Sequence, residues 1–414
     1  MSSRTLFSIA SLRSLAVTIL LLASGASAAL AQSSKPAVDP QFAVWLSELK
    51  AEARGLGISQ STLDSALEGV APIARVIELD QKQPEFTQTF WNYVDKRVTA
   101  DRIARGQELL NGLAPLMERI ELEFGVPARY LVAFWGLESN FGDYQGEYRV
   151  VAALATLAYD DRRGRFFRSQ LLDALRILDK GEVSPNKMVG SWAGAMGQVQ
   201  FLPETYLRYA VDADDDDRRD IWSSTPDALA SAANYLKNLG WDGSETWGRE
   251  VILPPDFDLT LAELGNEKSL LEWSRLGVMR SDGGQLPPIT TRGAIILPGG
   301  HAGPAFLVYP NFHVIMRWNR SILYAIAVGH LADRIAGGGG LSAQRPETER
   351  PLSRDQVMEM QHSLIALGLY SGDADGVVGS KTREALRTFQ SQVGLPPDAY
   401  PTPELLATLR KAVP

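Results

Sequence analysis

Residues 130–142 read YLVAFWGLESNFG and place one carboxylate, Glu138, at the end of an apolar run. Pro127 before this run suits the first turn of a helix, and Gly142 after it suits a helix end. The residues between them are mostly helix-compatible. The sequence therefore predicts a helix from Pro127 to about Gly142, with Glu138 near its C-terminal end.

Helical spacing surrounds Glu138 with apolar side chains. Trp135, Phe134 and Leu131 lie three, four and seven positions earlier and share its face. Partial burial and the negative end of the helix dipole both disfavour the ionised form, so we expect its pKa to rise toward the range useful for a general acid. On this stretch alone, a solvated glutamate with no catalytic duty is an equal alternative.

The composition bounds the class of protein. The 414-residue chain is 45% hydrophobic and 22% charged, which suits a large core and two or more domains.

Arg4 and Arg13 precede the apolar run LAVTILLLASGASA, and small-residue cleavage sites end at Ala28 and Ala31. Residues 1–31 are therefore predicted to be a cleaved secretory signal peptide. A retained membrane anchor is the alternative, which the short apolar run disfavours.

Several chemistries are excluded by residue content. The chain has no cysteine, which rules out disulfides, thiolate ligands, cysteine nucleophiles and a cysteine-linked lipid. Without the signal peptide, 39 basic side chains stand against 49 acidic ones, a formal charge of about −10, so nucleic acid is not an expected partner. The sequence also lacks paired histidines, a nucleophile-elbow serine and a phosphate loop, which argues against peptidases, esterases and nucleotide-dependent enzymes.

The pattern of residue types along the chain predicts its domains. Helical apolar spacing dominates residues 39–335, and β-branched runs with Pro/Gly breaks between 250 and 315 predict a small inserted β-element. Residues 336–352, with four consecutive glycines followed by a polar, proline-punctuated stretch, are predicted to be a flexible linker. Residues 353–412 are predicted to be a compact helical unit whose small core favours binding over catalysis.

Four blocks, in order along the chain, resemble the signature blocks of the B-type lytic murein transglycosylases. They are GLESNFG (136–142), GSWAGAMGQVQFLPETYLRYAVDADDDDRRDIW (190–222), ANYLKNLGW (233–241) and NFHVIMRWNRSILYAIAV (311–328). The C-terminal unit is similar to the three-helix peptidoglycan-binding domain through LGLYSG, DADGVVGSKT and FQSQVGL. The resemblance implies a mainly α fold: a lysozyme-like helical catalytic domain with a small β-containing insertion, and a C-terminal three-helix module.

The resemblance also implies a reaction. This family cleaves the β-1,4 bond between N-acetylmuramic acid and N-acetylglucosamine, and its single acid/base glutamate matches Glu138. Such an acid can protonate the departing oxygen and then take the proton of the muramic C6 hydroxyl as that oxygen attacks C1, leaving a 1,6-anhydromuramic end. Glu204, nearby in the second block, has no role in the family pattern and is interpreted as a surface residue.

Two other functions remain alternatives. A hydrolytic muramidase shares the acid and the fold but leaves a reducing end. A non-catalytic wall-binding or scaffold protein needs only the C-terminal module, and the intact ESNFG stretch argues against it. The expected partner is the peptidoglycan glycan strand, with other cell-wall enzymes as a second class; the expected location is the periplasm, with no stable membrane anchor.

Five further residues match functional positions of the family. Ser191 and Gln200 match substrate-binding positions, Asn319 matches an active-site asparagine and Tyr324 a supporting tyrosine. Trp318 stands where a tyrosine is usual; it can stack on a sugar face but lacks the phenolic hydroxyl, which leaves a hydrogen-bonding role at this position open. In the alternative interpretation, Trp318 and Tyr324 are core aromatics.

An acidic stretch predicts a structural Ca²⁺ site, no cofactor being required for the chemistry. Asp212, Asp214 and Asp216 alternate as in the start of an EF-hand loop, although the turn glycine and the closing glutamate of that loop are missing. Some family members close a calcium loop here with a later aspartate, which matches Asp227, and the Arg218 carbonyl is placed to supply the backbone ligand. A solvated acidic turn without a cation is the alternative.

Overall fold

The computed structural model describes residues 39–82, 88–160, 162–346 and 350–413. The predicted signal peptide, residues 1–31, lies outside these ranges. In the part of the chain that is described, no helix combines the length and the apolar character needed to cross a membrane.

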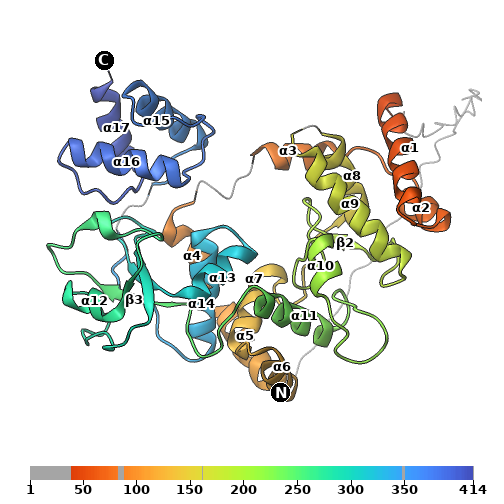
Figure 1. The fold of residues 1–414 in the computed structure, drawn as a ribbon, viewed down its shortest axis with the longest axis horizontal. Helices are drawn as coiled ribbons and strands as arrows, with labels where there is room; N and C mark the ends of the chain where they lie inside the picture. The colour runs from red at the N-terminus through yellow and green to blue at the C-terminus, as the bar shows by residue number, and fades with distance from the viewer. Residues whose placement is uncertain (1–38, 83–87, 161, 347–349, 414) are drawn as a thin grey trace, which may run out of the picture. The chain divides into compact units, whose positions relative to one another are not determined.

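The described residues are mostly helical, as predicted (Figure 1). The elements in chain order are α1 Pro40–Gly55, α2 Gln60–Ala66, α3 Ala74–Lys82, α4 Phe90–Arg97, α5 Ala100–Gly112, α6 Ala114–Phe124, α7 Ala128–Ser139, β1 Tyr148–Arg149, α8 Val150–Tyr159, α9 Gly164–Asp179, β2 Val189–Gly190, α10 Pro203–Tyr209, α11 Thr225–Asn238, β3 Gly248–Ile252, the 3₁₀ helix η2 Leu259–Leu261, β4 Lys268–Ser269, α12 Leu270–Arg275, β5 Met279–Arg280, β6 Arg292–Ile296, β7 Ala305–Val308, α13 Pro310–Trp318, α14 Ile322–Ile335, α15 Arg354–Ala366, α16 Ser380–Gln392 and α17 Pro403–Ala412.

Helix α7, which carries Glu138, lies inside the helical body. Every residue from 130 to 137 is buried, because the helix is apolar on all sides and is surrounded by other elements. Helices α5, α6, α11 and α14 pack against it. Neighbouring helices therefore fix the axis of α7, and with it the place at which Glu138 emerges.

The end of α7 differs from the prediction. The helix ends at Ser139 instead of continuing to Gly142, because Asn140 and Phe141 adopt left-handed backbone with φ of 52° and 63°. The Phe141 ring folds back over Gly136, where an added Cβ would lie 2.7 Å from the ring. Burial of this ring offsets the strain of two left-handed non-glycine residues.

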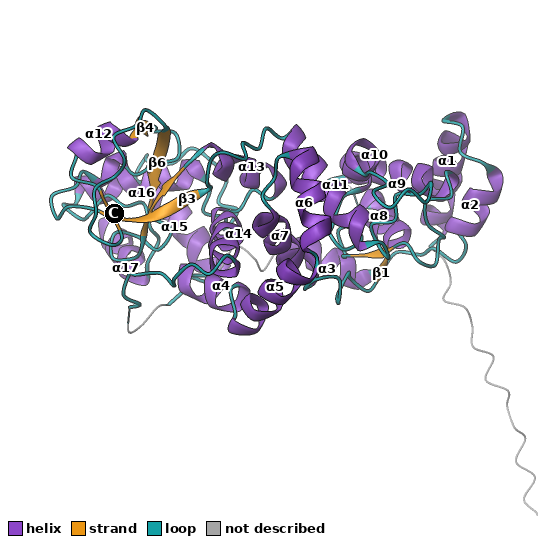
Figure 2. Ribbon diagram, turned by 90° about the horizontal axis from the view of Figure 1, so that it is seen from below, coloured by secondary structure: helices purple, strands orange, loops and turns teal. Residues whose placement is uncertain are grey.

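The predicted β-element is a five-stranded antiparallel sheet with strand order β4-β6-β7-β3-β5. Ile295 of β6 and Leu307 of β7 contribute to a small core around Trp273, while Ile296 and Phe306 contribute to the main helical core. Because alternate residues of a strand point to opposite faces, the central strands β6 and β7 are buried on both sides, whereas the edge strand β5 is exposed. Helix α12 lies beside it (Figure 2). The two-stranded pair β1–β2 was not predicted.

Part of the predicted linker contacts the sheet. The backbone amides of Ser342 and Ala343 each donate a hydrogen bond of 2.7 Å to the Glu250 carboxylate on β3. Residues 347–349 lie outside the described part of the chain. The bounds and the flexibility of the linker, 336–352, therefore stay a prediction.

The C-terminal unit consists of three helices, α15, α16 and α17, as predicted. Val357, Met360 and Leu364 of α15 are buried together with Leu386 and Phe389 of α16. Helix α17 packs against α15 and completes this core. The predicted small core of this unit is therefore present and is built from all three helices.

The buried His330 of α14 makes stability depend on pH. Burial, and second the positive Arg334, lower the pKa of His330 from 6.5 to about 4. Between these values the unfolded chain binds a proton that the folded chain does not, so the free energy of unfolding falls as the pH falls from about 6.5 toward 4. At about pH 5 we expect a loss of about 2 kcal/mol relative to neutral pH.

Denaturant unfolding followed by tryptophan fluorescence measures this loss. All nine tryptophans lie at or before position 318, so the signal reports on the part of the chain that contains His330. His330→Gln should flatten the pH dependence, whereas His362→Gln, at an exposed histidine of α15, should leave it unchanged. An equal acid loss in the wild type and in His330→Gln would contradict the prediction.

Candidate active site

Glu138 is half-buried in the last turn of α7, and one of its oxygens accepts two hydrogen bonds. Trp318 Nε1 donates to Oε1 at 2.9 Å, and the Tyr324 hydroxyl donates to the same atom. Trp318 is the last residue of α13 and Tyr324 lies in the first turn of α14, so three helices meet at this carboxyl. Two donors on one oxygen fix the orientation of the carboxyl and stabilise its charge.

Aromatic rings form one wall of the site. Phe134, one turn before Glu138, lies with its ring centroid 4.5 Å from that of Trp318, and the Phe201 centroid lies 5.5 Å from that of Trp318. Burial, with the negative Glu138 adding to it, raises the pKa of Tyr324 well above its usual value. Tyr324 therefore remains protonated and acts as a hydrogen-bond donor.

Trp318 makes the hydrogen bond that the sequence left open. An indole N–H donates as a phenol does, but it can neither accept a hydrogen bond nor ionise. Trp318 and Tyr324 are therefore more than core aromatics, because both contact the Glu138 carboxyl.

Two of the remaining predicted substrate-binding residues, Gln200 and Ser191, contact backbone atoms through their side chains. Gln200 Nε2 donates to the Gln145 carbonyl at 3.0 Å, and Ser191 Oγ accepts from the Ala195 amide at 3.1 Å. Asn319 is exposed directly after α13. These contacts hold the loops beside the Glu138 turn, and the roles of the three residues in substrate binding stay predictions.

Gln198 is a residue of the site that the sequence analysis missed. It is 4% exposed, and its Oε1 accepts a hydrogen bond of 3.0 Å from Trp135 Nε1. Its backbone carbonyl accepts a 2.6 Å hydrogen bond from the Ser139 hydroxyl. The sequence GQVQ contains two glutamines, Gln198 and Gln200, and either could have been considered for the site. Only Gln200 matches a family position, so Gln198 was not selected.

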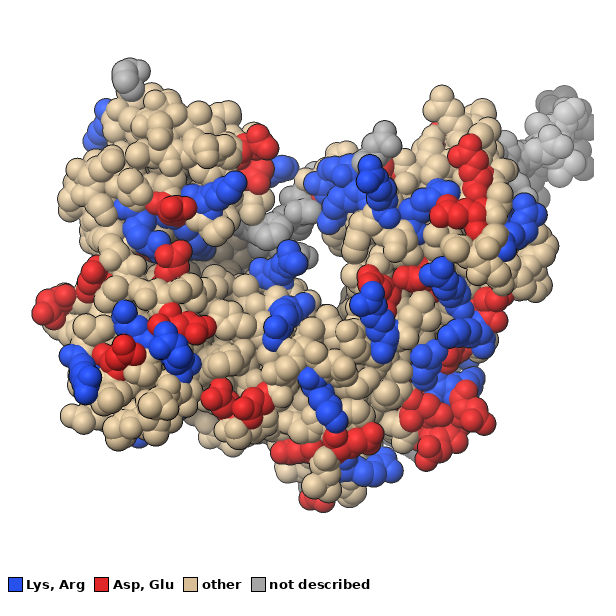
Figure 3. Space-filling view, viewed as in Figure 1, with Lys and Arg blue, Asp and Glu red and all other residues tan. Residues whose placement is uncertain are grey.

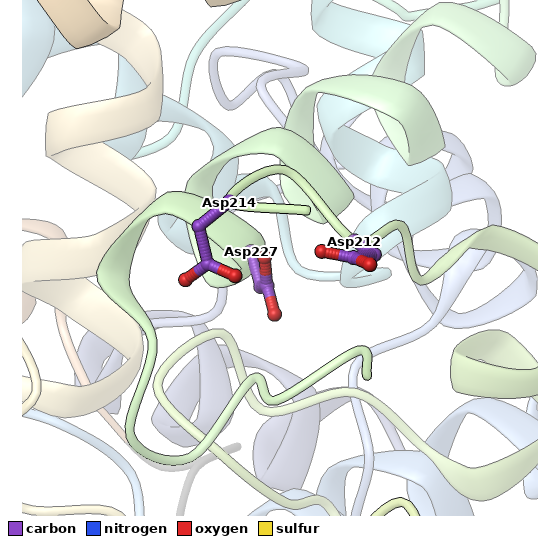
Figure 4. Close-up of side chains that lie close together, drawn as sticks. All are labelled: Asp212, Asp214 and Asp227. Atoms are coloured by element: carbon purple, nitrogen blue, oxygen red, sulfur yellow. The ribbon is translucent and has the colours of Figure 1, made fainter. Parts of the chain in front are cut away.

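Three of the predicted metal ligands form a cluster (Figure 4). Asp212, Asp214 and Asp227 each place one carboxylate oxygen within 4.8 Å of the others. Asp227 is fully buried in the first turn of α11, and its oxygens accept hydrogen bonds from the backbone amides of Ala213 at 2.7 Å and Asp220 at 2.8 Å. Burial raises the pKa of Asp227, and the other two carboxylates raise it further. Clustered carboxylate oxygens fit the preference of Ca²⁺.

Asp216 is engaged elsewhere. Its carboxylate accepts hydrogen bonds from the backbone amide and the guanidinium of Arg218 at 3.0 and 3.1 Å. It does not belong to the group of three carboxylates found among the described residues. Its role as a ligand, and that of the Arg218 carbonyl, stay predictions.

Comparison with known proteins agrees with this geometry. Residues 41–333 match the family model described as transglycosylase SLT domain, and residues 353–409 match the putative peptidoglycan binding domain. The chain is 30% identical over 269 residues to the membrane-bound lytic murein transglycosylase B of Escherichia coli (strain K12), which covers 62% of this chain and 70% of that protein.

Solved structures extend the likeness to both parts of the chain. The crystal structure of SltB3 from Pseudomonas aeruginosa in complex with NAG-anhNAM-pentapeptide is 46% identical, with a TM-score of 0.86, over 89% of this chain and 99% of that chain. The structure of the E. coli lytic transglycosylase Slt35 in complex with calcium is 26% identical, with a TM-score of 0.62, over 72% of this chain and 93% of that chain. The chain therefore belongs to the transglycosylase SLT domain family, as a lytic murein transglycosylase with a C-terminal peptidoglycan-binding domain.

Proposed function

We propose that Glu138 is the single acid/base of this lytic transglycosylase. The observation that carries the proposal is the pair of donors, Trp318 and Tyr324, on one oxygen of the Glu138 carboxyl. In its protonated form Glu138 gives its proton to the glycosidic oxygen between N-acetylmuramic acid and N-acetylglucosamine as that bond breaks. The two donors then stabilise the carboxylate that this step produces.

The second step closes the muramic ring on itself. The Glu138 carboxylate takes the proton of the C6 hydroxyl, the C6 oxygen attacks C1 of the same sugar, and a 1,6-anhydromuramic end forms. No water is consumed and Glu138 returns to its protonated form. Because the nucleophile belongs to the substrate, its effective concentration is high and no second carboxylate is needed. The anhydro sugar bound to the relative SltB3 supports this choice over hydrolysis.

Mass spectrometry of the soluble products from purified peptidoglycan tests the proposed reaction. We expect anhydromuropeptides from the wild type. Reducing muramic ends would instead assign the chain as a hydrolytic muramidase. Binding to the wall without release of products would leave a non-catalytic wall-binding protein.

The C-terminal unit, residues 353–412, is the wall-binding module in this proposal. Tethering raises the local concentration of the catalytic domain on an insoluble substrate without new contacts at the cleaved bond.

Figure 3 shows basic and acidic side chains intermingled on one face of the molecule, which does not favour a polyanion as partner. The chain acts in the periplasm after removal of residues 1–31, on glycan strands and beside other cell-wall enzymes.

A structural Ca²⁺ ion completes the proposal. Asp212, Asp214 and Asp227 would hold it, and the donor set supports the assignment because three clustered carboxylates repel one another without a cation. The ion would join the loop before α11 to the first turn of that helix. The relative Slt35, solved with calcium, supports the choice of metal.

Calcium is expected to stabilise the wild type. At a concentration one hundred times the dissociation constant, binding to the folded state alone adds about 2.7 kcal/mol to the free energy of unfolding. Asp214→Asn removes an exposed member of the cluster and leaves the backbone contacts of Asp227 intact, so it should lower the affinity measured by calorimetry and the calcium-induced rise in melting temperature. Asp217→Asn, an exposed carboxylate of the same loop, is the control. Equal responses from both variants would argue against the site.

A further inference from the structure

We propose that Gln198 is a positioning residue for Glu138. It acts through Trp135 and Ser139, which lie three residues before and one residue after the glutamate on the same helix. This inference rests on the acid/base role proposed for Glu138. The contacts of Gln198 with α7 are made to these two neighbours of the glutamate.

The side chain of Gln198 fixes the face of α7 that carries the glutamate. Its Oε1 accepts the indole N–H of Trp135 at 3.0 Å, in a contact that is fully buried. The amide fits there because Gly142 has no side chain: an added Cβ would lie 2.9 Å from Oε1. The turn after α7 is therefore shaped around this glutamine.

The backbone of Gln198 fixes the turn itself. Its carbonyl accepts a 2.6 Å hydrogen bond from the Ser139 hydroxyl, which in turn accepts the Gly142 amide at 2.9 Å. Ser139 is 2% exposed, so it exchanges no hydrogen bond with bulk solvent. Ser139, the residue next to Glu138, therefore donates one hydrogen bond and accepts another through its hydroxyl. These two bonds limit rotation of the last helical turn.

Gln198 is held in turn by the segment after the acidic loop. Its backbone amide donates to the Ile221 carbonyl at 2.9 Å, and its Nε2 donates to the Trp222 carbonyl at 3.4 Å. Gln145 Nε2 donates to the same Trp222 carbonyl at 2.9 Å. Both ends of the buried amide are used, as an acceptor for the indole and as a donor to the carbonyl, which an apolar residue of the same length cannot reproduce.

This arrangement predicts a loss of rate rather than of substrate affinity. A displacement of about 1 Å at a catalytic group can cost on the order of 100-fold in rate. Gln198→Met keeps the length of the side chain and removes both hydrogen bonds. On soluble peptidoglycan oligomers we expect it to lower kcat by about 10- to 100-fold, with KM changed by less than about threefold.

Two further variants separate positioning from simple destabilisation. Trp135→Phe leaves Gln198 in place and removes the indole donor, together with part of the buried ring. It should lower kcat in the same way and add little to the loss caused by Gln198→Met. Gln170→Met is the matched control: Gln170 is 1% exposed and exchanges hydrogen bonds with Glu204, so the variant should lose stability and keep its kcat.

The outcomes are distinct for the two proposals. Unchanged kcat in both Gln198→Met and Trp135→Phe, with Glu138→Gln inactive, would overturn the positioning role alone. Activity retained by Glu138→Gln would overturn the acid/base role on which it rests. If Gln198→Met does not fold, Trp135→Phe decides the question, because a fall in kcat at constant KM supports positioning and an unchanged kcat contradicts it.

Discussion

Glu138→Gln is expected to lower kcat by about 10²- to 10⁴-fold, the range that a positioned acid/base contributes. The amide can still accept hydrogen bonds from Trp318 and Tyr324, but it can neither give a proton to the glycosidic oxygen nor take one from the C6 hydroxyl. Because one residue serves both steps, the loss affects both. Release of soluble muropeptides from purified peptidoglycan, measured over time, gives the rate.

The matched control is Glu204→Gln. Glu204 lies in the first turn of α10, where it pairs with Arg208 at 2.8 Å and its side chain is 45% exposed. Its substitution removes one carboxylate from the same domain and should leave kcat unchanged. Equal melting temperatures for the wild type and Glu138→Gln would show that the fold is kept. Comparable losses in both variants, or activity retained by Glu138→Gln, would contradict the assignment.

Tyr324→Phe is expected to lower kcat by about 10- to 100-fold, which corresponds to one hydrogen bond to a charged group. The ring stays and only the hydroxyl is lost, so the carboxyl keeps a single donor, Trp318, on Oε1. Trp318→Phe should have a similar effect. Losing either donor destabilises the carboxylate relative to the acid. Because the reaction starts from protonated Glu138, the alkaline limb of the pH–rate profile should move to higher pH.

The control for both variants is Tyr235→Phe. The Tyr235 ring lies 5.2 Å from that of Trp318, so this substitution changes the same aromatic group without removing either of the two donors to Glu138. Its kcat and its pH–rate profile should match those of the wild type. A Tyr324→Phe enzyme with the same kcat and the same pH–rate profile as Tyr235→Phe would show that the hydroxyl has no part in the reaction.

Much of the fold could be predicted because its signals are local. Helical apolar spacing correctly predicted a mainly helical chain, and Pro/Gly breaks with β-branched runs located the sheet. The strand order β4-β6-β7-β3-β5 could not be predicted, since it depends on pairing between distant segments. The predicted end of α7, at about Gly142, was wrong. The left-handed backbone at Phe141 depends on the packing of its ring over Gly136, and this tertiary contact cannot be predicted from local sequence.

The site was predictable to the extent that residue type determines chemistry. Glu138 could be found from its place at the end of an apolar helix and from the family blocks. The contact of Trp318 with Glu138 could not, because the two residues are 180 positions apart and an indole donor is not the usual group there. Gln198 was missed for a related reason: one of its two links to α7 is its backbone carbonyl, which any residue type would provide.

The most direct test of the account is digestion of peptidoglycan by the full-length mature chain in water enriched in heavy oxygen. Intramolecular attack by the C6 hydroxyl takes no oxygen from the solvent, so the muramic ends released by the wild type should be anhydro sugars without label. Heavy oxygen at C1 of the released muramic acid would mean that water is the nucleophile, and it would contradict the proposal that Glu138 directs ring closure.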